Sequence, residues 1–124
     1  MRIGQKLVLA GSAVLVLSAL LHGSGYVKVT RAMAKSDAAE NLVAAFKALW
    51  LMYSFHLALL GIVFYEASRA GRARRLVLLG ALITASDAVI MFHFIGVFIG
   101  TIALTAATLL VLAGGFLLKG SRAV

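Results

Sequence analysis

The sequence contains no cysteine and no proline among its 124 residues. The lack of cysteine excludes disulfides, thiol catalysis, iron–sulfur clusters and cysteine-ligated zinc. The lack of proline removes the residue that most strongly breaks helices, and abundant alanine, leucine and valine favour long ones. Acidic residues are also scarce, with 4 Asp and Glu against 12 Lys and Arg. Only 13% of the residues are charged, which is too few to cover the surface of a water-soluble fold.

Long apolar runs fill most of the chain, and 63% of its residues are hydrophobic. A transmembrane helix needs roughly 20 mainly apolar residues. Four segments meet this requirement, at about residues 3–21, 42–65, 76–98 and 101–118. The sequence therefore predicts one all-α integral membrane domain over residues 1–124, built as an antiparallel bundle of four transmembrane helices.

The third and fourth spans form one apolar stretch that is too long for a single crossing. Gly96, Gly100 and Thr101 supply the turn between them, with Thr101 as the N-cap of the fourth helix. The first span follows Arg2 and Lys6 and has the form of a signal peptide, but no small-x-small cleavage site follows it. We therefore expect a retained helix.

Positive charges predict the orientation of the bundle. The basic residues that fall on one side are Arg2, Lys6, Arg69, Arg72, Arg74, Arg75, Lys119 and Arg122. Lys28, Arg31 and Lys35 fall on the other side, where Asp37 and Glu40 partly balance them. This bias places both termini in the cytoplasm of a multi-pass protein of the bacterial inner-membrane type. The net charge of +8 belongs to these loops, and without a soluble basic domain no nucleic-acid partner is expected.

The first loop, residues 22–41, is the only long one. Its lysines and arginine recur at helical spacing, and apolar side chains follow another side, which predicts a short interfacial helix in the headgroup layer. A solvated linker is the alternative. Asp37 and Glu40 have the spacing of a capping box, so the second transmembrane helix is expected to begin at Asp37.

Ionisable residues inside a membrane span are costly and usually functional. His56 lies about twelve residues from the outer end of its helix and Asp87 about eleven from the outer end of the next, so both lie near the bilayer midplane. Because a short loop joins these helices, we expect His56 and Asp87 to form a pair that shares one proton. Lys47 lies on the opposite side of its helix from His56 and is expected to reach the outer headgroups.

His22 and His93 lie at similar depths, where a haem or metal ion could bind between them. Two histidines without a carboxylate or a tight spacing are weak evidence for a metal, so no cofactor is expected. His93 lies about 120° around its helix from Asp87, on the same face as Ser86.

Aromatic residues gather in the outer halves of the second and third helices. Trp50, Tyr53 and Phe92, together with His56, Asp87 and Ser86, are predicted to line an apolar cavity that has a few polar groups, as ligand sites do, and His93 is a further candidate for substrate binding. We expect this cavity to bind or transform a lipophilic small molecule, of the terpenoid, sterol-like or quinone type. His56 and Asp87 would then be the acid/base residues of a membrane-embedded isomerase, cyclase or hydrolase.

The sequence is also compatible with other functions. The His56–Asp87 pair is, in the simplest alternative, a structural hydrogen bond between two helices. The chain would then be an accessory or assembly subunit of a larger membrane complex, acting through its lipid-facing surfaces. A third possibility is a small proton-coupled exporter that works as a homo-oligomer. Membrane lipids are partners in each case.

Overall fold

A computed structural model describes residues 1–70 and 73–118, and within these ranges the chain is helical without strands. Its helices are α1 (Ile3–Ser24), α2 (Tyr26–Met33), α3 (Glu40–Ala70), α4 (Arg74–Ile95) and α5 (Ile99–Leu117). The four long ones, α1, α3, α4 and α5, are each long and apolar enough to cross a membrane. The predicted all-α bundle of four membrane-spanning helices is confirmed. Arg72, Lys119 and Arg122, which entered the orientation argument, lie outside the described residues.

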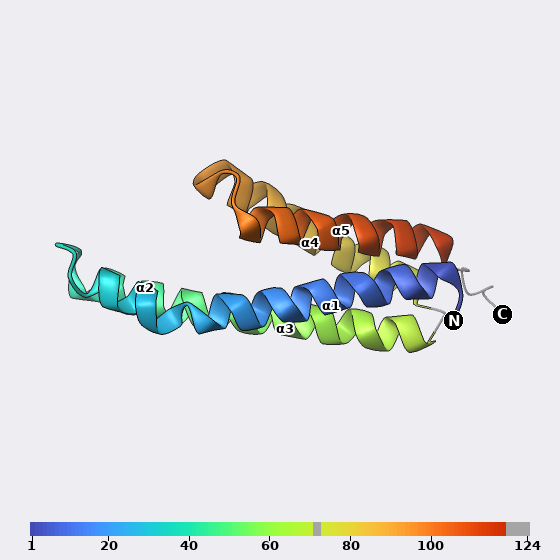
Figure 1. The fold of residues 1–124 in the computed structure, drawn as a ribbon, viewed down its shortest axis with the longest axis horizontal. Coiled ribbons are helices and arrows are strands. Elements are labelled where there is room, and N and C mark those ends of the chain that lie inside the picture. Colours follow the sequence, from blue (N-terminus) through green and yellow to red (C-terminus); the bar gives the residue numbers. More distant parts are fainter. Residues whose placement is uncertain (71–72, 119–124) are drawn as a thin grey trace.

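The helices pack in the spatial order α3, α1, α5, α4. Helix α1 contacts both α3 and α5 along much of its length, and α4 packs on α5. Helices α3 and α4, although consecutive, touch at only a few positions. Figure 1 shows the α1–α3 and α4–α5 pairs close together at the end where α1 begins, and diverging toward the other end. We call these the inner and outer ends of the bundle.

Small residues bring the helix backbones together at the inner end. A Cβ atom on Gly114 would lie 2.8 Å from the Gly4 carbonyl oxygen and 2.6 Å from Val8 Cγ2, so only glycine fits between α1 and α5. Between α1 and α3, the Ser12 hydroxyl donates a buried hydrogen bond of 2.6 Å to the Gly61 carbonyl oxygen. Since lipid provides little hydrophobic drive between helices, such close packing is what holds membrane bundles together.

The buried side chains are also concentrated in the inner part of the bundle. The largest fully buried side chains include Val8 and Leu15 of α1, Phe64 of α3 and Val111 of α5. In α3 no residue before Leu57 is buried, and in α4 none after Thr84. The packed core therefore occupies the inner part of the bundle, and the outer parts of α3 and α4 are open.

The turn between α4 and α5 is centred on Gly96, whose φ of 84° requires glycine. The N-cap of α5 is Phe98, so the expectation that Thr101 is the N-cap is wrong. Thr101 instead acts from the third helical position: its hydroxyl oxygen accepts the Phe98 backbone N–H at 2.9 Å and donates to the Phe98 carbonyl at 2.8 Å. The helix thus begins two residues earlier than expected, at Ile99.

The first loop contains the predicted short helix, α2. Figure 1 shows α2 continuing along the axis of α1 toward the outer end, rather than leaving it sideways. The predicted capping box at Asp37 is wrong, because α3 begins at Glu40 and its first backbone N–H bonds go to the Ala39 carbonyl. The Ser36 hydroxyl explains the shift: it bonds to the Met33 carbonyl at 2.6 Å, so the chain through residue 36 belongs to the turn that ends α2.

The glycine contacts generate a stability prediction. We expect Gly114→Ala to lower the free energy of unfolding by about 1–3 kcal/mol, because its methyl group would overlap α1. Gly23→Ala is the matched control, since the nearest atom to its Cβ would be Ser54 Oγ at 3.8 Å. Thermal unfolding in detergent measures both variants. Equal stability of the two would show that the α1–α5 contact does not hold the bundle.

Candidate functional site

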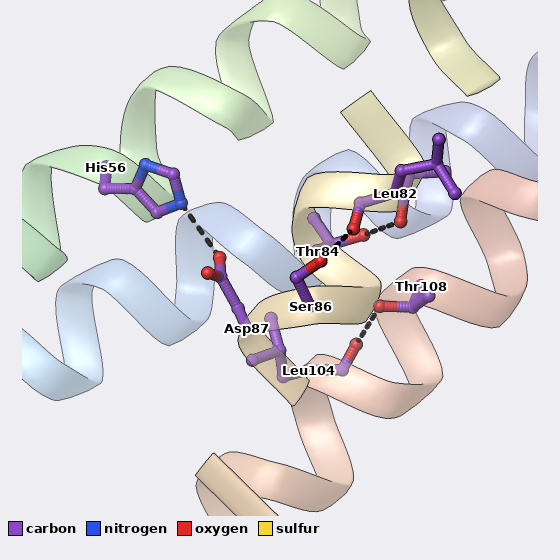
Figure 2. A network of polar contacts seen from close by, with 8 residues as sticks. His56, Leu82, Thr84, Ser86, Asp87, Leu104 and Thr108 are labelled. Carbon is purple, nitrogen blue, oxygen red and sulfur yellow. Dashed lines mark hydrogen bonds and ion pairs between the residues drawn. The ribbon is translucent and has the colours of Figure 1, made fainter. Parts of the chain in front are cut away.

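The predicted pair of ionisable residues meets across the gap between α3 and α4. His56 Nε2 lies 2.8 Å from Asp87 Oδ2, as Figure 2 shows. The side chains are 39% and 18% exposed respectively, so the pair lies at the open side of the bundle and outside the core. It is the one ion-pair contact among the described residues.

At this distance a hydrogen bond joins His56 Nε2 and Asp87 Oδ2. In a low-dielectric setting an isolated carboxylate or imidazolium would be costly, and the pair avoids both. The arrangement can hold a proton between the two side chains, and it can also simply tie α3 to α4. The role of His56 and Asp87 as acid/base residues stays a prediction.

A second polar cluster joins α1 to α3 nearer the outer end. Trp50 Nε1 donates to the His22 carbonyl oxygen at 2.9 Å. The His22 ring stacks on the Trp50 ring with centroids 4.0 Å apart, and its Nδ1 lies 2.9 Å from Ser54 Oγ. The sequence analysis missed Ser54, although its position one turn after Trp50 on the same helix was a usable signal.

The Ser54 hydroxyl links the protonation of a neutral His22 ring to its own hydrogen bond with α3. The Ser54 hydroxyl has a single hydrogen, and Ser54 Oγ lies 3.1 Å from the Trp50 carbonyl oxygen, which can only accept. When the hydroxyl donates there, it must accept from His22, so the ring hydrogen is on Nδ1. Nε2 of His22 is then left as a hydrogen-bond acceptor.

A cavity of about 250 Å³ opens beside this cluster, between the outer parts of the helices. Its wall is mainly apolar. The wall includes Leu21 and His22 of α1, Trp50 and Tyr53 of α3, and Ala103 and Leu104 of α5. The predicted cavity residues Trp50 and Tyr53 are thus brought together, and α1 and α5 supply walls that the sequence did not indicate.

The Tyr53 hydroxyl is buried in this wall and has no hydrogen-bond partner within the described part of the chain. Its ring lies edge-on to His22, with centroids 5.2 Å apart, and parallel to His56 at 6.0 Å. A buried hydroxyl without a partner loses its hydration and gains nothing in return. Tyr53 is therefore a lining residue whose hydroxyl lacks a partner but has almost no accessible surface, so another molecule would reach it only after a neighbouring side chain moves.

Ser86, Phe92 and His93 do not line the cavity. All three are exposed on α4, where the Ser86 hydroxyl donates to the Leu82 carbonyl of its own helix at 2.9 Å (Figure 2). Phe92 is 60% exposed, and His93 lies edge-on to its neighbour Phe94. The physical reason is the packing of α4 on α5, which turns this face of α4 outward. Their predicted part in substrate binding has no support from this geometry.

The proposed His22–His93 haem or metal site has few free ligands. The His22 ring is occupied on one face by Trp50 and at Nδ1 by Ser54. In residues 1–70 and 73–118, no three His, Cys, Asp or Glu side chains gather as metal ligands would.

Comparisons of this chain with protein families, curated proteins and solved structures found no match. The function is therefore inferred from the residues of the site itself.

The His56–Asp87 contact predicts energetic coupling between α3 and α4. In a double-mutant cycle with His56→Phe and Asp87→Ala, we expect a coupling energy of about 1 kcal/mol, within the range measured for hydrogen bonds between membrane helices. Unfolding in detergent at graded denaturant concentrations provides the four free energies. Ser86→Ala is the control and should change little, because Ser86 bonds only within α4. Strict additivity of the two substitutions would contradict the pair.

Proposed function

We propose that this protein binds a small lipophilic molecule that carries a hydrogen-bonding oxygen, in the cavity at the outer end of the bundle. The observation that carries the proposal is the Tyr53 hydroxyl, which is buried in the wall of an apolar cavity without a partner. A ligand oxygen would complete its hydrogen bonding. Apolar walls with one or two fixed polar groups are the usual composition of small-molecule sites.

The cavity sets the size of the ligand. Its 250 Å³ is slightly below the roughly 300–1,000 Å³ typical of pockets for drug-sized molecules. It suits a terpenoid, a quinone head group or part of an acyl chain better than a whole sterol. His22 is a second residue with a polar side chain in the same wall.

Binding has more support than chemical conversion. His56 and Asp87 do not line the cavity, and the His56 ring reaches it only through its contact with Tyr53. A reaction by this pair would need a ligand that extends past Tyr53 toward the gap between α3 and α4. We therefore place ligand binding first and acid/base conversion second.

Tyr53→Phe tests the proposal because the two effects expected of it have opposite signs. Without ligand, the variant should be more stable than the wild type by about 1 kcal/mol, since an unsatisfied buried hydroxyl is removed. With ligand, its affinity should fall about 2- to 12-fold, since one hydrogen bond is lost. Thermal unfolding with and without farnesol or menadione measures both quantities, because a ligand raises stability by an amount set by its affinity.

Two controls define the result. Tyr65→Phe removes a hydroxyl from the same helix outside the cavity and should change neither quantity. Ala103→Phe should fill the cavity and abolish the response to either probe.

Native mass spectrometry of the protein released from its own membrane then identifies a bound molecule. Loss of stability in Tyr53→Phe without ligand, or retention of the chain only in a larger complex, would favour the accessory-subunit alternative.

A further inference from the structure

A row of cationic side chains continues outward from the wall of the cavity. Positions 21, 24, 28 and 31 are spaced by three and four residues, so they follow one face of α1 and α2, and Lys35 follows in the turn after α2. Gly25, at the junction of α1 and α2, has right-handed helical angles of φ −72° and ψ −15°, so the face passes from α1 into α2 with little change of direction. The row begins with Leu21 at the cavity and ends in three cations, Lys28, Arg31 and Lys35.

These three cations line an open groove that runs from the end of α1 along α2 to the turn after it, together with Ser24, Val27 and Ala32. In the described part of the chain none of them pairs with a carboxylate. The groove is therefore a cationic surface that begins one helical turn outward from Leu21, a residue of the cavity wall.

Depth along the bundle relates the cations to the polar groups in the cavity. A Cβ atom on Gly25 would lie 3.3 Å from the Trp50 ring, and one on Gly23 would lie 3.8 Å from Ser54, so residues 23–25 lie beside residues 50–54. Tyr53 is thus level with Gly23. Lys28 lies five residues further out, or about 7–8 Å at the rise of an α-helix.

The same depth fits the membrane surface. About 20 residues of α1 span the roughly 30 Å of hydrocarbon, which puts the outer boundary near Gly23. Lys28 then lies within the headgroup layer, and the longer side chain of Arg31 can reach back to it.

We propose that the cavity takes a single-chain anionic lipid: its acyl chain lies in the cavity, an ester oxygen bonds to Tyr53, and its phosphate binds Lys28 and Arg31. This inference rests on the proposed function and adds the charge of the ligand and its orientation. The backbone of Lys28 lies about 7–8 Å further out than the level of Tyr53, so the charged head of such a lipid would lie outward of its ester.

Lys47 provides a matched control. It lies three residues before Trp50 and so at about the level of Lys28, but it lines a separate groove with Glu40, Val43 and Ala44. General attraction of anions to the outer surface would involve Lys47 as much as Lys28. Binding of the lipid in the cavity would instead involve Lys28 and Arg31 and leave Lys47 without a role.

The test compares two lipids that differ by one phosphate, oleoyl lysophosphatidic acid and monooleoylglycerol. The full chain in dodecylmaltoside is titrated with each, and fluorescence of Trp50, the one tryptophan of the chain, reports the cavity. A basic residue near a membrane surface contributes about fivefold to the binding of an anion, so we expect wild type to prefer the phosphate form by about 25-fold. Lys28→Gln combined with Arg31→Gln should remove this preference, and Lys47→Gln should retain it.

The outcomes separate this inference from the proposed function. Equal affinity of wild type for both lipids, with both responses lost in Ala103→Phe, would overturn the anionic ligand and leave the cavity as a lipid site. Responses that persist in Ala103→Phe would overturn both. Equal loss of preference in Lys47→Gln would show general surface attraction and refute the specific site. Displacement of the lipid by millimolar inorganic phosphate would also refute the specific site, because the cations would then bind phosphate without an acyl chain in the cavity.

Discussion

The close approach of helix backbones at the inner end is the contact on which the rest of the molecule depends. In lipid, helices gain little by hiding apolar side chains from one another, so they associate where small residues allow dense packing. Gly114 against Gly4, and Ser12 against Gly61, supply such places near the inner end. At the outer end the α4–α5 pair diverges from the α1–α3 pair, and the cavity lies between the outer parts of the helices.

Polar contacts then fix how far the outer parts diverge. The bonds of Trp50 and Ser54 to His22 hold α3 beside α1, while the His56–Asp87 pair connects α3 to α4 where apolar packing between them is slight. Hydrogen bonds between membrane helices are individually modest, but they are directional. They act here as spacers of defined length, which keeps a partly open bundle in one geometry.

The sequence correctly predicted the depth of a residue along its helix. It did not predict which side chains face the cavity, because that depends on which helices pack against each other. Counting residues placed His56 and Asp87 at one depth, because helical rise is constant and the two helices run in opposite directions. The same counting gave no information on which helix α4 packs against. Its packing on α5 turns Ser86, Phe92 and His93 away from the cavity. That choice is made by glycine contacts between distant segments, which a single sequence does not reveal.

The missing proline has a consequence that extends from the fold to the ligand. Because no proline stands near Gly25, α2 continues in roughly the direction of α1 across this turn, and residues of both helices share a face. Had α2 turned to lie flat in the headgroup layer, Lys28 and Arg31 would have left the line of the cavity. The continued direction instead places apolar wall, hydroxyl and cations in order of increasing distance from the inner end. An amphiphile has the same order of groups, from its chain end through its ester to its charged head, so this geometry gives it one orientation, head outward.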